Sequence, residues 1–121
     1  MNDTITEKII SSAIEVHKIL GPGLLESIYE EALCYEFQLK GIEFERQKEL
    51  DVFYKGKVIK GQRVDLIVNG EVIVEIKSVR RLEEIFTAQL LSYLKSTGLK
   101  RGLLINFGQK RLIDGLKRIS L

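Results

Sequence analysis

Hydrophobic residues recur at helical spacing near the N-terminus. Apolar residues three and four positions apart predict an amphipathic helix with one buried stripe. The stripe consists of Ile9, Ala13, Val16 and Leu20. Thr4 and Glu7 have capping-box spacing and are expected to begin this helix. Gly21-Pro22-Gly23 is expected to end it, because proline cannot continue the backbone hydrogen-bond ladder.

A second helix is predicted from about Leu24 to Leu39, with Gly41 as a cap just beyond its end. Its apolar residues at helical spacing lie on or near one face. They are Leu25, Ile28, Ala32, Tyr35 and Leu39.

From Phe44 the pattern becomes that of extended segments separated by short turns. Three strands are predicted, near Glu49–Tyr54, Val58–Val68 and Val72–Ser78. The turns between them are Lys55-Gly56 and Asn69-Gly70, both rich in residues that tolerate a positive φ.

Helical spacing returns over Arg81–Ser96, and a short β-rich run follows over Arg101–Phe107. The tail after Gly108 fits either a helical turn or an edge strand. The order α-α-β-β-β-α-β predicts an α/β (α+β) fold with a central mixed sheet flanked by helices. The crossover through the third helix should place strand 101–107 parallel to strand 72–78.

Chain length and composition predict one globular domain over residues 1–121. The single cysteine, Cys34, cannot form an internal disulfide or a four-cysteine metal site, and its apolar neighbours predict an inert core thiol. No apolar run has the length of a membrane span, and the N-terminus lacks the shape of a signal peptide. We therefore expect a cytoplasmic protein.

Charge is distributed unevenly along the chain. Residues 1–51 carry 5 Lys/Arg against 11 Asp/Glu, whereas residues 52–121 carry 14 against 6. A basic half can attract a polyanion such as nucleic acid, or it can simply be solvated surface. Charge alone leaves both open.

Charged residues interrupt the stretch VDLIVNGEVIVEIK, which is otherwise typical of two buried strands. Asp65 lies in the first strand, and Glu75 and Lys77 share one face of the second. Burying these charges is costly unless each has a partner, a metal or water. Alternatively, the second strand is no longer buried after Val74, and Glu75 and Lys77 are exposed to solvent.

Two carboxylates followed by a lysine form an Asp…Glu-x-Lys set suited to Mg²⁺ or Mn²⁺. A strict two-residue Asn-Gly turn would place Asp65 and Glu75 on opposite faces of the hairpin. A three-residue loop would place them together. A shared metal therefore requires a bulge or bend between Asp65 and Glu75.

Gln89 and Tyr93 are four residues apart and so lie on one face of the third predicted helix. Their amide and phenol could donate hydrogen bonds to a phosphate or contact Lys77. The alternative is an ordinary amphipathic helix border.

Several motifs together carry a family resemblance. The segment GLLESIY (Gly23–Tyr29) has the form Gly-x-x-Glu-x-x-Tyr, and VDLIVNGEVIVEIK, AQLLSYLK and GLLINFG follow in order. The chain closely resembles the bacterial and archaeal GxxExxY protein family, which is classed with the PD-(D/E)XK nuclease-like superfamily. The resemblance extends from about Ile5 to Gly108.

This resemblance implies a restriction-endonuclease-like core with a metal site at one end of the sheet. Asp65 and Glu75 match the superfamily's metal-binding carboxylates, and Lys77 matches its catalytic lysine. Glu26 matches the acidic residue that many members carry on an early helix. The Ile76 carbonyl is expected to join the carboxylates as a metal ligand.

Gln89 and Tyr93 match the Gln-x-x-x-Tyr signature of the exonuclease branch. Val64 departs from the proline that usually precedes the aspartate. His17, the only histidine, is expected to be structural, because Mg²⁺ sites seldom use imidazole. Tyr29 could steady Glu26 or simply pack in the core.

The expected function is metal-dependent hydrolysis of nucleic acid by a Mg²⁺-activated water, with DNA favoured over RNA. Exposed basic residues would contact the phosphate backbone. These are Arg63, Arg80, Arg81 and Lys95. One alternative is a non-catalytic nucleic-acid-binding or assembly module of the same fold, acting as a homodimer or in a larger assembly. A second alternative is a purely structural domain, in which the pairs Glu75/Lys77 and Gln89/Tyr93 are simply exposed to solvent.

Overall fold

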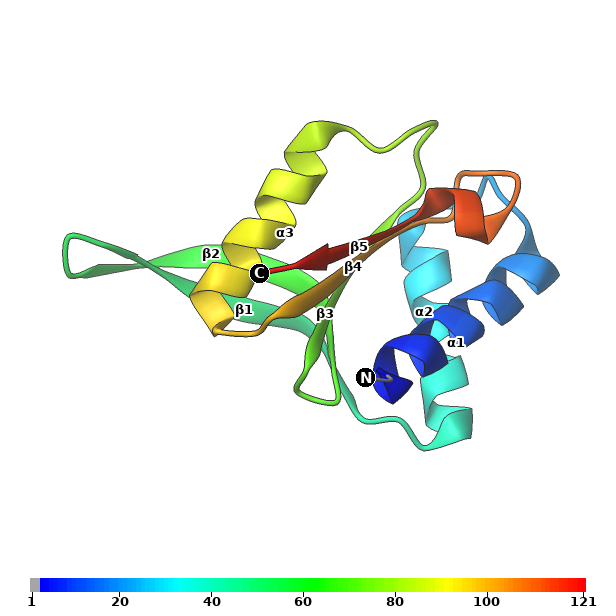
Figure 1. The fold of residues 1–121 in the computed structure, drawn as a ribbon, viewed down its shortest axis with the longest axis horizontal. Helices are drawn as coiled ribbons and strands as arrows, with labels where there is room; N and C mark the ends of the chain where they lie inside the picture. The colour runs from blue at the N-terminus through cyan, green and yellow to red at the C-terminus, as the bar shows by residue number, and fades with distance from the viewer. Residues whose placement is uncertain (1–2) are drawn as a thin grey trace.

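The computed structural model describes residues 3–121, which form a mixed sheet with helices on both faces (Figure 1). The helices are α1 (Thr4–Leu20), α2 (Glu26–Lys40), α3 (Glu84–Thr97) and the 3₁₀ helix η1 (Leu112–Gly115). The strands are β1 (Phe44–Tyr54), β2 (Lys57–Val68), β3 (Val72–Lys77), β4 (Arg101–Asn106) and β5 (Leu116–Ser120). The predicted mixed sheet flanked by helices is confirmed.

The sheet has the strand order β1-β2-β3-β4-β5. Strands β3 and β4 are parallel, with Val72 opposite Arg101, and all other neighbours are antiparallel. The parallel pair is joined through α3, as the sequence predicted. Such a crossover returns the chain to the same edge of the sheet, so the ends of β3 and β4 lie side by side.

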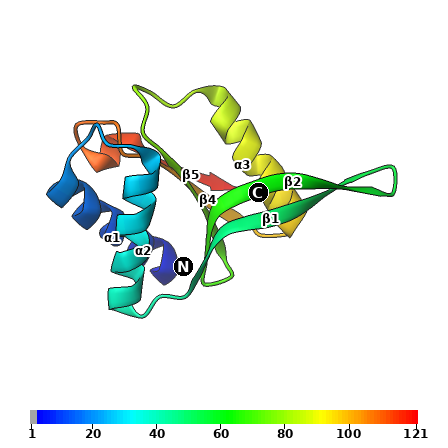
Figure 2. The same cartoon turned by 180° about the vertical axis from the view of Figure 1, so that it is seen from behind.

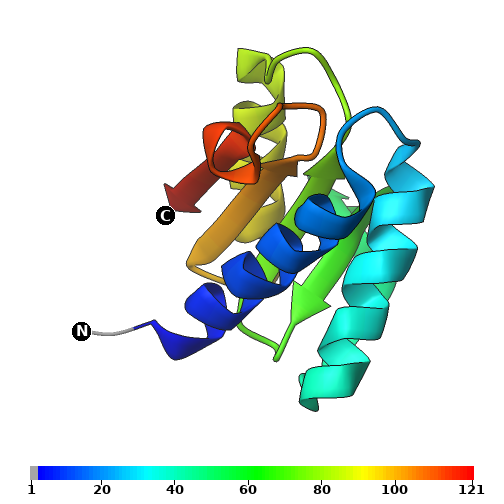
Figure 3. The same cartoon turned by 90° about the vertical axis from the view of Figure 1, so that its right-hand side faces the viewer.

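The helices cover the two sheet faces unequally (Figure 3). Helices α1 and α2 pack on one face over Val72, Val74 and Ile76, and α3 packs on the other face over Ile73 and Leu104. Strand β3 is thus buried on both sides, which explains its nearly continuous apolar sequence. None of the helices within residues 3–121 has the length and apolarity needed to span a membrane.

The start of α1 differs from the sequence prediction. Asp3, rather than Thr4, is the N-cap residue, and its carboxylate accepts a hydrogen bond of 3.2 Å from the Thr6 backbone N–H. An aspartate at this position also interacts favourably with the positive end of the helix dipole. The predicted Thr4–Glu7 capping box is therefore wrong by one residue.

The buried face of α2 is not the face on which the sequence grouped its apolar residues. Tyr29, Leu33 and Phe37 are fully buried, whereas Leu25 and Leu39 of the predicted face are 73% and 63% exposed. Both sets recur at helical spacing, so periodicity alone could not choose between them. The choice depends on tertiary contacts, including the stacking of Tyr29 on Phe107 at 4.4 Å between ring centroids.

The outer parts of β1 and β2 leave the body of the protein as a two-stranded arm (Figures 1 and 2). Leu50 and Val64 are the last residues of these strands in the hydrophobic core. Beyond them, a register shift between Leu50 and Val52 interrupts the ladder, and Gly61 takes a φ of 108°. We call residues 52–63 the hairpin arm.

The C-terminal tail contains both of the structures that the sequence left open. A single 3₁₀ turn over Leu112–Gly115 is followed by the edge strand β5, which pairs with β4. Other boundaries differ by a few residues: α2 begins at Glu26 and α3 at Glu84, after a loop that the sequence suggested was helical.

Asn106 connects the end of β4 to the loop that follows β3. Its side chain is fully buried. Its Oδ1 accepts hydrogen bonds of 3.0 Å from the N–H groups of Val79 and Gly108, and its Nδ2 donates one of 2.9 Å to the Val79 carbonyl. The backbones at Gly108 and Val79 come so close that a Cβ on Gly108 would lie 2.2 Å from the Val79 oxygen.

We expect Asn106→Asp to destabilise the protein by about 1–3 kcal/mol, because an acceptor would replace the buried donor that faces the Val79 carbonyl. Urea unfolding monitored by circular dichroism measures this loss. The exposed Gln38→Glu on α2, an amide-to-acid change at a side chain with no hydrogen bond within residues 3–121, is the matched control and should change stability by less than about 0.5 kcal/mol. Equal stability of the two variants would contradict the assigned role of Asn106.

Candidate active site

The turn between β2 and β3 sets which residues of the two strands face each other. Val68 pairs with Val72, so the loop has three residues, Asn69, Gly70 and Glu71. Asn69 and Gly70 have φ values of 55° and 64°, and the Glu71 N–H donates to the Val68 carbonyl at 3.0 Å. Positive φ at both central residues is the pattern of a type I′ turn, which leaves Glu71 as the extra residue.

This three-residue loop gives β2 and β3 the register that a metal shared by Asp65 and Glu75 would require. Leu66 pairs with Val74, so one further step of the register sets Asp65 opposite Glu75. The two carboxylates, ten residues apart in the chain, therefore meet at the same place in the sheet. The predicted register is confirmed.

Strand β2 changes its orientation at Asp65. Val64 packs with the α3-side cluster and Leu66 with the α1/α2-side cluster, although residues two apart normally share a face. On the neighbouring strand β1, Gln47 lies opposite Asp65 and has a left-handed φ of 48°. The expected local bend is therefore present, and the hairpin arm leaves the sheet beyond it.

Asp65 and Glu75 exchange hydrogen bonds with each other's strands. The Asp65 backbone N–H donates to Glu75 Oε2 at 2.7 Å, and the Ile76 N–H donates to Asp65 Oδ2 at 2.8 Å. Glu75 is only 6% exposed, and Asp65 is half-buried. These contacts fix both carboxylates at the point where the β2–β3 ladder stops.

The proximity and burial of the two carboxylates change their acidity. Burial, followed by the negative charge of Asp65, raises the pKa of Glu75 to about 7. Burial also raises the pKa of Asp65, although its hydrogen bond from the Ile76 N–H acts in the opposite direction. Lys77 lowers both pKa values, but not enough to cancel the effect of burial. Perturbed carboxylates of this kind are common at functional sites.

Lys77 and Tyr93 lie close enough to Asp65 and Glu75 to interact with them electrostatically. The Lys77 Nζ lies 4.4 Å from the centroid of the Phe86 ring on α3. Tyr93 is 8% exposed, and burial together with the charges of Glu75 and Asp65 raises its pKa. Gln89 is on the same helix, where its side chain is exposed.

Glu26 is the first residue of α2 and faces the loop after β3. Its Oε2 accepts a hydrogen bond of 3.3 Å from the Ser78 N–H, and the Ser78 hydroxyl donates to the Leu24 carbonyl at 2.6 Å. In the described part of the chain, no three His, Cys, Asp or Glu side chains are arranged to hold a metal. The structure thus brings together Asp65 and Glu75, and Glu26 is not gathered with them as a third ligand.

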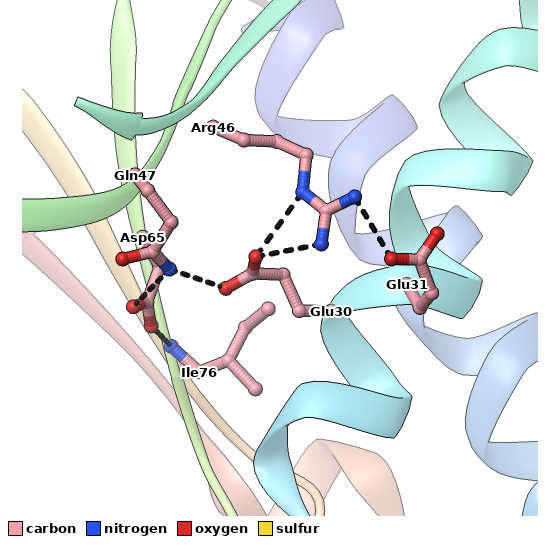
Figure 4. A network of polar contacts seen from close by, with 6 residues as sticks. All are labelled: Glu30, Glu31, Arg46, Gln47, Asp65 and Ile76. Atoms are coloured by element: carbon pink, nitrogen blue, oxygen red, sulfur yellow. Dashed lines mark hydrogen bonds and ion pairs between the residues drawn. The ribbon is translucent and has the colours of Figure 1, made fainter.

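A polar network that the sequence analysis missed connects α2 to Asp65 (Figure 4). Gln47 Nε2 donates to Glu30 Oε1 at 2.8 Å and to Asp65 Oδ1 at 3.3 Å. Arg46 binds Glu30 Oε2 through Nε and Nη2 at 3.1 and 2.9 Å, and it binds Glu31 at 3.0 Å. Both Asp65 oxygens therefore have a donor, and the left-handed backbone of Gln47 directs its amide to this position.

One sequence signal could have identified Glu30. It lies four residues after Glu26 and hence one turn further along the same side of α2. Gln47 gave no comparable signal, because its position depends on a backbone conformation that glutamine rarely adopts.

Three other residues singled out in the sequence have structural roles. The His17 Nε2 lies 2.8 Å from the Gln109 carbonyl, and its ring stacks with Phe107. The Tyr29 hydroxyl donates to the Gly21 carbonyl at 2.5 Å and accepts from the Leu24 N–H at 3.1 Å. Tyr29 thus fixes the loop before Glu26 without a hydrogen bond to it. Burial raises the pKa of the Cys34 thiol to about 11, as expected for an inert core cysteine.

Comparison with known proteins identifies the family. The family model described as the PD-(D/E)XK nuclease superfamily matches residues 3–119. The chain belongs to the PD-(D/E)XK nuclease superfamily. No curated protein matches it. Among solved structures, the one described as "Crystal structure of SSO0001" is 22% identical, with a TM-score of 0.49 and coverage of 96% of this chain and 77% of that chain.

Membership of the PD-(D/E)XK nuclease superfamily agrees with the architecture. The mixed five-stranded sheet between helices is consistent with a restriction-endonuclease-like fold. Asp65, Glu75 and Lys77, which we matched from the sequence to the superfamily's signature, lie where β2 and β3 diverge. The family supports a nuclease function, which the geometry of these residues helps to specify.

The raised pKa of Glu75 predicts a pH-dependent cost to stability. A folded pKa of about 7, above the ordinary value of 4.5, favours the protonated form in the folded state. The stabilisation from this proton is complete below pH 4.5 and disappears as the pH rises through 7. Without metal, Glu75→Gln should therefore be more stable than wild type at pH 8 by about 1–3 kcal/mol.

Urea unfolding in EDTA at pH 5 and pH 8 measures this difference, which should nearly disappear at the lower pH. Glu15→Gln, at an exposed carboxylate on α1, is the matched control and should show no such pH dependence. Identical pH profiles for wild type and Glu75→Gln would refute the assignment.

Proposed function

We propose that this protein is a metal-dependent nuclease of the GxxExxY branch of the superfamily. The observation that supports this most strongly is the juxtaposition of Asp65 and Glu75, each bonded to the backbone of the other's strand, with Lys77 two residues beyond. The ordered motifs from Gly23–Tyr29 onward support the branch assignment.

Asp65, Glu75 and the Ile76 carbonyl would hold Mg²⁺ or Mn²⁺, with Glu26 completing the set directly or through water. The fit is supported by the two neighbouring carboxylates, whose mutual repulsion and burial a divalent cation would relieve. When bound, such a metal supplies an acidified water and polarises a phosphate oxygen. Glu26 is exposed, so its side chain has space to reorient towards the pair.

The surrounding residues would position the substrate. Lys77 would orient the attacking water and offset charge on the phosphate, and its contact with the Phe86 ring restricts its ammonium group. Tyr93, buried beside the acids, would donate a hydrogen bond to a phosphate oxygen. Gln89 would contribute from the exposed side of the same helix.

The proposed substrate is nucleic acid. Arg80 and Arg81 lie exposed in the loop directly after β3, and Arg63 lies two residues before Asp65. These cations would contact phosphates on both sides of the site, with limited dependence on base sequence. Lys95, exposed on α3, would add a further contact.

A non-catalytic binding or assembly module of the same fold is the alternative. The observation that favours it is that each carboxylate already accepts a backbone N–H and that no three potential ligands gather within residues 3–121. Metal binding and cleavage, measured separately, distinguish the two functions.

We expect Lys77→Ala to reduce Mg²⁺-dependent cleavage of DNA or RNA by at least about 100-fold, because the attacking water would lose its orienting group. Asp65→Ala should abolish cleavage. Gel assays measure the rates, and circular dichroism checks that the fold is retained. Lys18→Ala, which removes an exposed lysine of α1 that has no part in the proposed site, should cleave like wild type. Unchanged activity in Lys77→Ala and Asp65→Ala would refute the proposal.

Metal binding is tested without any substrate. At a Mn²⁺ concentration of about 100 times its Kd, wild type should gain about 2.7 kcal/mol of stability. Asp65→Asn should lose this gain, whereas Glu15→Gln should keep it. If Mn²⁺ stabilises wild type through Asp65 but no nucleic acid is cleaved, the non-catalytic alternative is favoured.

A further inference from the structure

The hairpin arm makes no contribution to the hydrophobic core. None of its residues belongs to either core cluster, and residues 53–61 are all exposed. Phe53 and Tyr54 on β1 are 71% and 60% exposed, and Val58 and Ile59 on β2 are each 42% exposed. The pairs Val52–Ile59, Phe53–Val58 and Tyr54–Lys57 form a regular antiparallel ladder closed by a Lys55-Gly56 turn. The arm is thus an ordered ribbon with apolar side chains available on both faces.

All charged residues of the hairpin arm are basic. Its four charged residues are Lys55, Lys57, Lys60 and Arg63, and it contains no acid. Only Lys60 is paired, with Asp51 at 2.5 Å, among the ion pairs of residues 3–121. Two such arms from different copies would repel each other, whereas a polyanion would be attracted. This favours nucleic acid over a second copy of the chain.

The arm begins at the candidate active site. Arg63 is two residues before Asp65, and Gln47, with its left-handed φ, lies beside Asp65 on β1 (Figure 4). At about 3.3 Å per residue, the arm reaches at most roughly 26 Å from Asp65 to Lys57. This corresponds to roughly seven or eight base pairs of a duplex at about 3.4 Å each.

We propose that the hairpin arm lies in the major groove of duplex DNA beside the cleaved phosphate. This inference rests on the proposed nuclease function and specifies duplex DNA as its substrate. The major groove of B-DNA is about 12 Å wide and admits a two-stranded ribbon. The major groove of duplex RNA is too narrow and deep for one. Lys55 and Lys57 contact phosphates, and Phe53 and Tyr54 contact base edges or thymine methyl groups.

The test measures binding of a fluorescein-labelled random-sequence DNA duplex in EDTA, by anisotropy at several salt concentrations. Lys55→Ala/Lys57→Ala should weaken binding roughly tenfold and reduce the slope of log K against log salt by about 1.8. Lys8→Ala/Lys18→Ala, two exposed lysines on α1, is the charge-matched control and should change neither value. A labelled RNA duplex should bind wild type and the arm variant equally.

Three results would overturn the proposal. One is an equal effect of the two lysine pairs, and another is an arm-dependent affinity for duplex RNA. The third is a dimer, detected by sedimentation, that Phe53→Ala/Val58→Ala converts to a monomer while DNA binding is unchanged. If wild type cleaves DNA but binds it independently of the arm, only this inference fails. If wild type neither binds nor cleaves nucleic acid, the proposed function fails as well.

Discussion

Two hydrogen bonds, from the Asp65 N–H to the Glu75 carboxylate and from the Ile76 N–H to the Asp65 carboxylate, determine how β2 and β3 separate. Up to Leu66 and Val74, β2 and β3 form an ordinary ladder, and beyond that pair side-chain oxygens take the place of backbone carbonyls as acceptors. A carboxylate is a stronger acceptor than a carbonyl, so the strands are held together at this point without continuing to pair. The contact that gathers the acids therefore also allows the hairpin arm to leave the sheet.

Two backbone features make this contact possible. The three-residue loop at Asn69–Glu71 sets Asp65 and Glu75 in register, and a loop shorter by one residue would turn one of them to the other face. The left-handed φ of Gln47 bends β1 opposite Asp65 and directs its amide between Glu30 and Asp65. A non-glycine residue in this region is strained, and the Arg46–Glu30 ion pair next to it helps to hold the conformation.

Much of the fold and the acidic pair could be predicted from the sequence, because both are encoded locally. Turn residues and alternation located β3, and the charges within its apolar run identified Asp65, Glu75 and Lys77. The buried face of α2 could not be predicted, because the stripe of Tyr29, Leu33 and Phe37 and the exposed stripe have the same period. Gln47 was missed, and the tail was left open between a helical turn and an edge strand, because both depend on partners distant in the chain.

The buried and partly buried acids of the protein differ in whether a basic residue neutralises them. The acids near the N-terminus include Glu30 and Glu31, which are neutralised within the fold by Arg46. Asp65 and Glu75 have no such internal partner, since Lys77 lowers their pKa values only in part and its ammonium lies against Phe86. Burying two unneutralised carboxylates destabilises the free protein. A proton on Glu75 removes part of this cost below pH 7, and the divalent cation of the proposed function would remove it at higher pH. The exposed basic residues of the hairpin arm and the loop after β3 form no ion pair with Asp65 or Glu75 within residues 3–121.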